Sequence, residues 1–379
     1  MGIYAHHKGS ACHTTYNAST VTGEDPRRDP ALVAALRRIA PGTELRHGID
    51  DIIKGHLGAL IVIGEASELQ FLFSGGLQLD HPFSAQFLYE LAKMDGAIIL
   101  NASATRIVSA NIQLMPDPTI ASSETGTRHR TAERVAKQTG GLVISISQAR
   151  DTVSLYVKDI RYQLESIAEV LAKTNQAVAT LETYRNRLDQ VSSRLTALEF
   201  QNAATLDDVL VVLQRAEMAT RMGEEIERNV IELGREGRLI DMQLTELMEG
   251  VPRDRTNLVR DYLAESNLAE STLARLAELP YRRLLGFSEL AEVLGHGAVN
   301  PLDQAVTPRG YRALAHVPRL TDEIVRTVVE AFGGLDQLVR APLRELESLD
   351  GVGPAQAREI REGLRRLQEH NLMDRYLQL

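Results

Sequence analysis

Residues 142–157, LVISISQARDTVSLYV, contain two apolar runs with a short polar break between them. Each run, 142–147 and 152–157, has the length and the β-branched residue content of a buried strand. Only the four residues QARD separate the runs, which suffices for a hairpin but not for the helical crossover that parallel strands need. The stretch therefore predicts an antiparallel strand pair.

The segments on the N-terminal side of this hairpin alternate between strand and helix patterns. Apolar runs at 59–64, 96–100 and 106–114 predict further strands, and 30–39, 83–94 and 131–138 have helical spacing. This alternation predicts an α/β domain over residues 30–160, and the hairpin makes its sheet mixed rather than wholly parallel. Residues 1–29 are polar and unpatterned, and we expect a flexible extension there.

Composition limits the classes of protein that remain. The 379-residue chain is 44% hydrophobic, enough for two or three domains with cores, and its formal net charge of −9 means that any nucleic-acid contact must use a local basic patch. Cys12 is the single cysteine, which excludes a disulfide framework. No apolar run is long enough to span a membrane and no secretion signal is recognisable, so we expect a cytoplasmic protein.

Residues 161–300 change to a helical composition rich in Leu, Ala, Glu and Arg. A spacing of mostly three and four residues predicts one long helix with a single apolar seam. The seam is formed by Leu171, Thr174, Val178, Leu181, Tyr184, Leu188, Val191, Leu195 and Leu198. A structural spine or an oligomer contact is the expected role, and the breaks EGVPRD and GHGAVNP interrupt the helices that follow.

The stretch GTRHRTAERV, 126–135, places Arg128 and Arg130 on either side of His129, just ahead of the predicted helix. Such side chains in a loop are often simply solvated. Here Gly126 permits close backbone approach and Thr127 and Thr131 offer hydroxyls, while a helix N-terminus with arginine forks beside it can bind a polyanion. The pattern indicates an anion site, but no reaction by itself.

A second candidate lies in MDGAIIL, where Asp95 and Gly96 precede a predicted strand. A carboxylate at the head of a strand can hold a divalent cation, although Asp-Gly is also a common turn. A cation-binding acid and a polyphosphate site in one domain suggest nucleotidyl or phosphoryl transfer. A second acidic ligand is not obvious: Glu124 is near the loop, but it reads equally well as a solvated turn residue. SGGLQLD, 74–80, offers either close approach to a ligand or a plain turn.

The last 70 residues contain a faint repeat with a shift of 35 residues. LAHVPRLTDEIVRTVVEAFG from Leu314 aligns with LDGVGPAQAREIREGLRRLQ from Leu349, each being an apolar anchor, a tight turn and an amphipathic helix. In the second copy, Gly351 and Gly353 flank Val352 and Pro354 suits the first position of a helix. We expect the N–H groups of this turn to be free to contact phosphate.

LDGVGPAQAREI resembles the helix-hairpin-helix motif, and residues 301–379 resemble the paired module that holds duplex DNA by its backbone. The first copy is degenerate, since Val317-Pro318-Arg319 replaces the glycine pattern. Eleven arginines balance eleven acidic residues between 308 and 379, which is less basic than most DNA-binding modules. Arginines do gather on the last helix, and the resemblance assigns DNA contact to Gly351, Val352, Gly353, Arg358 and Arg361.

MDGA together with GTRHRTAER resembles the diadenylate cyclase domain. Followed by a helical spine and a helix-hairpin-helix module, the order of segments over 30–379 resembles the DNA integrity scanning (DisA) family. The resemblance implies condensation of two ATP molecules into cyclic di-AMP with release of two pyrophosphates. It assigns catalysis to Asp95, Arg128, His129 and Arg130, with Asp95 binding Mg²⁺ or Mn²⁺, and ATP binding to Gly96, Ala97, Leu114, Thr127, Arg128, His129, Arg130 and Thr131.

The same resemblance implies an assembly. Each domain would hold one ATP, so two cyclase domains must meet face to face, and the family leads us to expect a homo-octamer. Non-specific binding of branched DNA would then regulate the cyclase as a DNA-integrity checkpoint. The alternative is a DNA-binding scaffold or repair protein whose first domain binds nucleotide without turnover. The sequence has no Walker A segment, which argues against a P-loop ATPase.

Overall fold

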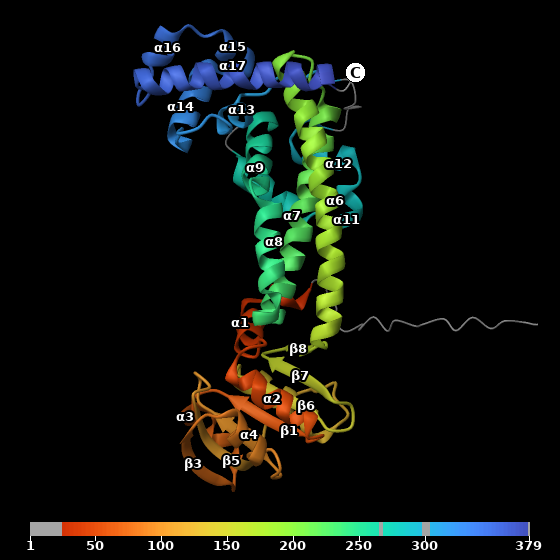
Figure 1. The fold of residues 1–379 in the computed structure, drawn as a ribbon. Helices are drawn as coiled ribbons and strands as arrows, with labels where there is room; N and C mark the ends of the chain where they lie inside the picture. Colours follow the sequence, from red (N-terminus) through yellow and green to blue (C-terminus); the bar gives the residue numbers. More distant parts are fainter. Residues whose placement is uncertain (1–24, 265–267, 298–303, 378–379) are drawn as a thin grey trace, which may run out of the picture. The chain divides into compact units, whose positions relative to one another are not determined.

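The computed structural model describes residues 25–264, 268–297 and 304–377 (Figure 1). The chain forms two compact units: an α/β unit that ends at Leu164, and a helical unit from Glu165 onward that also includes Ala40–Gly42. Of the expected extension, residues 1–24 lie outside the described residues. Residues 25–29 form the short 3₁₀ helix η1 (Pro26–Arg28) and the Asp29 cap of the following helix.

The α/β unit is built on one eight-stranded mixed sheet, as the hairpin predicts. The strand order is β2-β5-β4-β1-β6-β7-β8, with β3 also paired to β5; β1 and β4 are parallel and the other pairs are antiparallel. The strands are β1 (Ala59–Ile63), β2 (Phe73–Ser74), β3 (Leu77–Pro82), β4 (Ala97–Leu100), β5 (Arg106–Leu114), β6 (Leu142–Ser147), β7 (Thr152–Val157) and β8 (Ile160–Gln163). The β6–β7 hairpin pairs Ser147 with Thr152 across the QARD turn, which confirms its prediction.

Helices cover both faces of this sheet. Strands β1 and β4 are buried along their whole length, as expected of central strands between two helical layers. Leu60 and Val62 pack with residues of α5 (Thr127–Thr139), α3 (Ala66–Leu69) and η2 (Gln70–Leu72). The alternate residues of β1 point to the opposite face. There α2 (Glu44–Lys54) and α4 (Ala85–Leu91) lie against the sheet in Figure 1, with α1 (Pro30–Arg38) also in this unit.

The helical unit begins with the predicted seam. Helix α6 (Ile167–Phe200) packs along α7 (Leu206–Leu233), and every seam position predicted from the sequence is buried or partly buried in their common core. Capping boxes at Ser166 and Thr205 fix the starts of the two helices. The unit continues with α8 (Arg238–Met248), α9 (Val251–Tyr262), α10 (Ala269–Glu278), α11 (Tyr281–Leu284) and α12 (Phe287–Val293).

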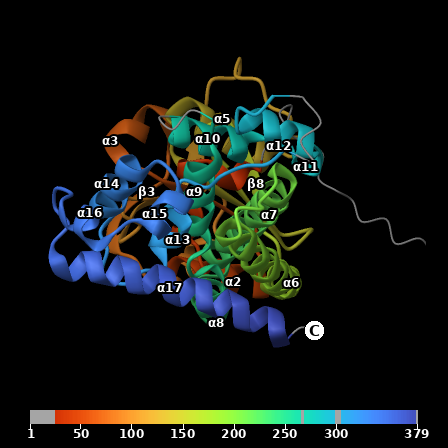
Figure 2. The same cartoon turned by 90° about the horizontal axis from the view of Figure 1, so that it is seen from above.

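The C-terminal part contains two helix-turn-helix pairs around one core. Its helices are α13 (Tyr311–Ala315), α14 (Asp322–Phe332), α15 (Leu335–Arg340), α16 (Leu343–Glu347) and α17 (Pro354–Leu377), and Figure 2 shows α17 running beside the shorter ones. Val317 and Val352, which the repeat aligns, are both buried at the turn of their pair. The expected boundary at residue 301 lies outside the described residues.

A buried polar junction ties this C-terminal part to α6 and α9. The Arg312 guanidinium lies 2.5 Å from a carboxylate oxygen of Glu199, and the Tyr262 hydroxyl donates to that carboxylate at 2.6 Å. Asp261 accepts hydrogen bonds from the backbone N–H groups of Gly310, Tyr311 and Arg312, at 2.7, 2.7 and 2.9 Å. These side chains are buried, so each charge depends on the partners from another helix.

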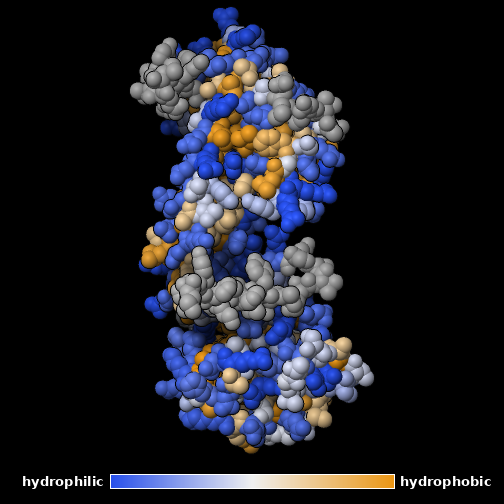
Figure 3. All heavy atoms as spheres, turned by 90° about the vertical axis from the view of Figure 1, so that its right-hand side faces the viewer, coloured by the Kyte–Doolittle hydropathy of each residue, from blue (hydrophilic) through white to orange (hydrophobic). Residues whose placement is uncertain are grey.

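Large apolar side chains are exposed at a few places. Figure 3 shows hydrophobic residues gathered on one part of the helical unit's surface, amid mostly hydrophilic residues. Exposed large side chains of this unit are Leu239, Met242, Leu268, Tyr281 and Leu285. Among the described residues, no helix has both the length and the hydrophobicity to span a membrane.

Candidate active site

The Arg-His-Arg stretch forms the first turn of α5. The sequence placed it in a loop ahead of a helix at 131–138, which is wrong: the helix begins at Thr127, and the N–H of Arg130 donates to the Gly126 carbonyl at 2.8 Å. Gly126 is the last residue before the helix. It has an extended backbone and no side chain that could accept a hydrogen bond from the first N–H groups of the helix. The N-terminus of α5 therefore carries no side-chain cap and leaves N–H groups of its first turn for an anion.

Arg128 lies against the start of β1. One guanidinium nitrogen, Nη1, donates to the Ile146 carbonyl at 3.3 Å. A Cβ atom built on Gly58 would lie 2.1 Å from the same nitrogen, so the guanidinium occupies the space that a side chain at residue 58 would fill. Gly58 thus helps to determine the position of the Arg128 charge, a role that the sequence did not reveal.

His129 is held from behind by a chain of polar groups. Its Nδ1 lies 3.0 Å from the Tyr156 hydroxyl, which donates to Glu124 at 2.8 Å, and Arg161 pairs with the same carboxylate oxygen at 2.5 Å. Burial lowers the pKa of His129 and raises that of Tyr156. Of the two interpretations of Glu124, the solvated turn residue is wrong, because its carboxylate is mostly enclosed and is bound to Tyr156 and Arg161.

Arg130 points in a different direction from its two neighbours. Its Nε donates to the Glu124 carbonyl at 3.2 Å and its Nη2 to the Thr125 carbonyl at 3.5 Å. Thr127 is exposed and Thr131 partly buried in the same turn. In this structure the Arg130 guanidinium fastens the loop before α5, whereas Arg128 and His129 are held by other strands.

The Asp95-Gly96-Ala97 stretch is at the head of β4. Gly96 has φ +97°, and a Cβ there would lie 2.8 Å from the Asn111 carbonyl carbon, so only glycine fits this approach to β5. Opposite it, Asn111 is also left-handed, with φ +55°, at an irregularity in the β4–β5 pairing. The neighbouring Asp95 is exposed, and its carboxylate has no partner among the residues that the structure describes.

The two motifs belong to one face of the sheet. Ala97, which follows the Asp-Gly pair, and Leu114, at the end of β5, pack in the same core cluster as Ala132 of α5 and Tyr156 of β7. Ala97 and α5 therefore pack in one layer on the same face of the sheet. Leu114 is buried in this layer.

The donor set fits a nucleotide-bound cation rather than a closed metal centre. Among the residues that the structure describes, no three His, Cys, Asp or Glu side chains are grouped so as to hold a metal. Mg²⁺ commonly takes one or two carboxylates and completes its shell with water and substrate phosphates. An exposed, unpaired carboxylate at Asp95 meets that requirement.

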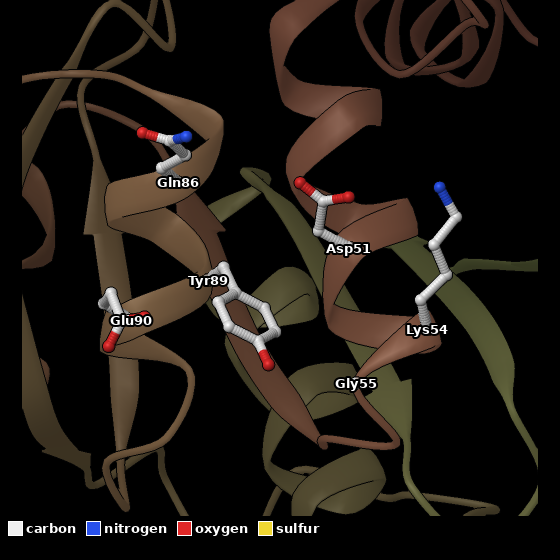
Figure 4. A pocket seen from close by; sticks show the side chains of 6 residues that line it. All are labelled: Asp51, Lys54, Gly55, Gln86, Tyr89 and Glu90. Atoms are coloured by element: carbon white, nitrogen blue, oxygen red, sulfur yellow. The ribbon is translucent and has the colours of Figure 1, made fainter.

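Two other features of this unit do not contribute motif residues. Gly75 and Gly76 form a turn with positive φ. A Cβ on Gly76 would overlap the Ile112 side chain of β5, whereas one on Gly75 would meet nothing within 4 Å. An open pocket of about 550 Å³ lies between α2 and α4 (Figure 4). It is lined by Asp51, Lys54, Gly55, Gln86, Tyr89 and Glu90, none of which was predicted as a site residue.

The second C-terminal turn is only partly as expected. Gly351 has φ +77° and nothing within 4 Å of its Cβ position, and Arg358 and Arg361 are exposed on α17. The expectation of free N–H groups is wrong for two residues: Val352 donates to the Leu349 carbonyl at 3.1 Å, and Gly353 donates to Gln356 Oε1 at 2.9 Å. Val352 is buried, so it anchors the turn and does not face solvent.

Comparison with known proteins agrees with both units. The family described as "DisA bacterial checkpoint controller nucleotide-binding" matches residues 46–160, and the "DisA bacterial checkpoint controller linker region" matches 164–302. The DNA integrity scanning protein DisA of Parafrankia sp. is 47% identical over 356 residues, covering 93% of this chain and 99% of the relative. DisA of Kineococcus radiotolerans is 48% identical over 357 residues (93% and 99%), and that of Streptomyces coelicolor 45% over 362 residues (94% and 97%). The chain therefore belongs to the DisA family of DNA integrity scanning proteins, and its α/β unit is a diadenylate cyclase domain.

Proposed function

We propose that the protein condenses two ATP molecules into cyclic di-AMP on the surface between the head of β4 and the N-terminus of α5. The observation that carries this proposal is the uncapped first turn of α5, which contains Arg128 and His129 and belongs to a helix packed in the same core layer as Ala97, the residue after Asp95 and Gly96. A helix N-terminus with a guanidinium beside it suits a triphosphate. The reaction is a nucleotidyl transfer in which the ribose 3′-oxygen of one ATP attacks the α-phosphorus of the other and pyrophosphate leaves.

The residues of α5 hold the leaving group. The backbone N–H groups of the first turn, the Thr127 and Thr131 hydroxyls and the Arg128 guanidinium bind triphosphate oxygens, and Arg128 offsets the charge that develops on pyrophosphate. His129 contributes a ring nitrogen to the same cluster. Arg130 acts by fixing the loop through its bonds to the Glu124 and Thr125 carbonyls.

The β4 stretch holds the reacting ribose. Asp95 would bind Mg²⁺ or Mn²⁺, which supplies charge that lowers the barrier to losing the 3′-hydroxyl proton. Gly96, without a side chain, lets the nucleotide lie on the backbone, and Ala97 and Leu114 form the apolar layer beneath the adenine. Asn111 neighbours Gly96 at an irregularity of the β4–β5 pairing.

Because one domain holds one ATP, two cyclase domains must face each other across a two-fold axis. We therefore infer a homo-oligomer, with an octamer as the expected size from the family. Leu239 and Met242 of α8 are exposed apolar side chains that such an assembly could cover.

The C-terminal pairs α13–α14 and α16–α17 would form a tandem helix-hairpin-helix module. Gly351, Val352 and Gly353 form the turn that meets the DNA backbone, and Arg358 and Arg361 add charge on the exposed side of α17. Several modules in one oligomer would favour DNA with more than one duplex arm. Binding of branched DNA in the cytoplasm would then lower cyclase output as a checkpoint signal.

The central experiment incubates the protein with ATP and Mg²⁺ or Mn²⁺ and separates the products by chromatography. Wild type yields cyclic di-AMP, and Asp95→Asn, which keeps the shape but removes the charge, lowers turnover by orders of magnitude. Asp51→Asn makes the same chemical change on α2 and should leave turnover intact. Product formation at the wild-type rate in Asp95→Asn contradicts the assignment, and no product from wild type favours the non-catalytic scaffold.

Coupling to DNA is tested in the same assay. Cyclic di-AMP formation is compared without DNA, with linear duplex and with a four-way junction, in wild type and in Gly353→Asp. The junction should slow wild type most, and the variant, whose turn repels phosphate, should not respond. Equal wild-type rates in all three conditions would remove the coupling and leave the cyclase activity standing.

A further inference from the structure

The side chains behind His129 form a linked chain that reaches from the core to the protein surface. His129 contacts Tyr156 of β7, Tyr156 contacts Glu124 in the loop before α5, and Glu124 contacts Arg161 of β8. None of the three partners belongs to the two cyclase motifs. We infer that Tyr156, Glu124 and Arg161 are positioning residues that keep the His129 proton on Nδ1, so that Nε2 takes up a second proton when a triphosphate binds. This inference rests on the proposed triphosphate site.

Tyr156 is fixed well enough to orient the ring. It is only 1% exposed, and it packs in the core cluster with Ala132 and Val135 of α5 and Val143 of β6. Its hydroxyl is the polar end of a rigid, buried side chain, 3.0 Å from Nδ1. The rings of His129 and Tyr156 are tilted by 58° with centroids 6.3 Å apart, so the contact is made through the polar atoms and not by stacking.

The direction of each hydrogen bond follows from the number of protons. The Tyr156 hydroxyl has one proton and donates it to Glu124 Oε1 at 2.8 Å. The Glu124 carboxylate, ion-paired with Arg161, can only accept. The Tyr156 oxygen is then left with lone pairs toward His129, and the ring must supply the proton from Nδ1. In the neutral imidazole the other nitrogen, Nε2, therefore carries a lone pair.

The charges around the ring keep it neutral before a ligand binds. Burial has the largest effect and lowers the pKa of His129; Arg161, Arg128 and Arg150 act in the same direction, and the Glu124 carboxylate opposes them. A neutral ring with a lone pair on Nε2 would repel phosphate oxygens, because both atoms are hydrogen-bond acceptors. When the triphosphate arrives its negative charge favours the imidazolium, one proton passes from solvent to Nε2, and both ring nitrogens then donate: Nδ1 to Tyr156 and Nε2 to phosphate.

Tyr156 thus matters more in the bound state than in the free state. The imidazolium needs an acceptor at Nδ1, and the Tyr156 oxygen, polarised by its bond to Glu124, provides one. Removing the hydroxyl should lower the pKa of His129 in the complex and so reduce proton uptake, whereas a residue that only fills space would not change it. Arg161 acts through Glu124, because its ion pair holds the Glu124 carboxylate in place.

The first measurement is calorimetric binding of 3′-deoxy-ATP with Mg²⁺, which cannot react, in two buffers of different ionisation enthalpy. Wild type at pH 7.5 should take up a measurable fraction of a proton. Tyr156→Phe, which keeps the ring in the core, should lose most of this uptake and bind about tenfold more weakly, as expected for a bond to a charged group. Tyr89→Phe on α4 makes the same chemical change at a tyrosine that does not contact His129, Glu124 or Arg161, and it should match wild type.

The second measurement is ¹⁵N NMR of the ligand-free histidine ring, which reads the tautomer without any activity. A protonated Nδ1 in wild type that becomes a tautomer mixture in Tyr156→Phe supports the inference. Glu124→Gln, which retains an acceptor but loses the Arg161 ion pair, should change proton uptake in the same direction and serves if Tyr156→Phe does not fold. Binding without proton uptake in wild type, or uptake unchanged in both variants, overturns the inference. Such a result leaves the cyclase assignment intact, whereas an absence of cyclic di-AMP would overturn the proposed function and leave the measured tautomer valid.

Discussion

Substituting Gly58 by alanine is the sharpest test of where the Arg128 charge must lie. Gly58 has no positive φ, so alanine does not strain the backbone. The added Cβ would lie 2.1 Å from Nη1, 2.9 Å from Cζ and 3.2 Å from Nη2 of Arg128. The guanidinium must therefore leave its place and lose its bond to the Ile146 carbonyl.

The structure predicts a large effect on activity and a small one on stability. The clashing atoms are the far end of a flexible side chain, which can swing away, so we expect a destabilisation below about 1 kcal/mol, in part offset by the lower entropy of the unfolded chain. A displaced guanidinium forfeits charge-assisted bonds to the triphosphate of about 1.5–3 kcal/mol. At about 1.4 kcal/mol per factor of ten, kcat/KM for ATP should fall roughly 10- to 150-fold.

The assay pairs initial rates of cyclic di-AMP formation with thermal unfolding. Gly64→Ala is the matched control, because Gly64 follows the other end of β1 and its Cβ would meet only the Leu69 side chain, at 3.2 Å or more. The control should keep wild-type kinetics. A Gly58→Ala variant that folds and retains the wild-type kcat/KM would show that catalysis does not depend on the observed position of Arg128.

Three further predictions follow from other contacts. Gln356→Ala frees the Gly353 N–H and should tighten DNA binding in a filter or anisotropy assay, whereas Gln356→Glu should weaken it; equal affinities would mean that this N–H does not meet phosphate. Burial lowers the folded-state pKa of His129, so its contribution to stability is present above its unfolded pKa of about 6.5 and is lost as the pH falls. His129→Gln should therefore flatten the pH dependence of the free energy of unfolding below that pH. An unchanged slope would contradict the lowered pKa. Arg312→Met leaves Glu199 buried and unpaired and should destabilise the helical unit by about 3–5 kcal/mol in denaturant unfolding, while a loss within experimental error would show that the pair is dispensable.

The sequence predicts most of the sheet because periodicity is a local property. The runs at 106–114, 142–147 and 152–157 match β5, β6 and β7 residue for residue, since each is bounded by turn residues. The predicted helix at 83–94 is shorter, Ala85–Leu91, and α2, β3 and β8 were missed. β3 is largely exposed, and its apolar alternation is limited to Leu77 and Leu79 before Asp80, His81 and Pro82, so its pairing with β5 is visible only in three dimensions.

The sequence predicts the two motifs of the site but not the residues that hold their side chains in place. The residue patterns marked Asp95 as a cation-binding candidate and the 127–131 stretch as an anion site, the resemblance added the ATP and catalytic roles, and these roles remain proposals. Gly58 and Tyr156 were missed, because 70 residues of chain separate Gly58 from Arg128 and 27 separate His129 from Tyr156, and nothing local marks either partner. The available signal for Tyr156 was a tyrosine in a strand predicted to be buried, because a buried tyrosine hydroxyl must find a hydrogen-bond partner.

The junction between α9 and α13 has a practical consequence for dissecting the protein. A cut between the spine and the C-terminal pairs, near residue 300, would separate Asp261 from the three N–H groups it accepts and Glu199 from Arg312. Both fragments would then contain polar groups without their hydrogen-bond partners, so neither fragment would keep the structure that it has in the full-length protein. Loss of function in a shortened protein could therefore result from the disrupted junction as well as from a missing DNA contact. Point substitutions on the exposed side of α17 test the DNA contact without disrupting the junction.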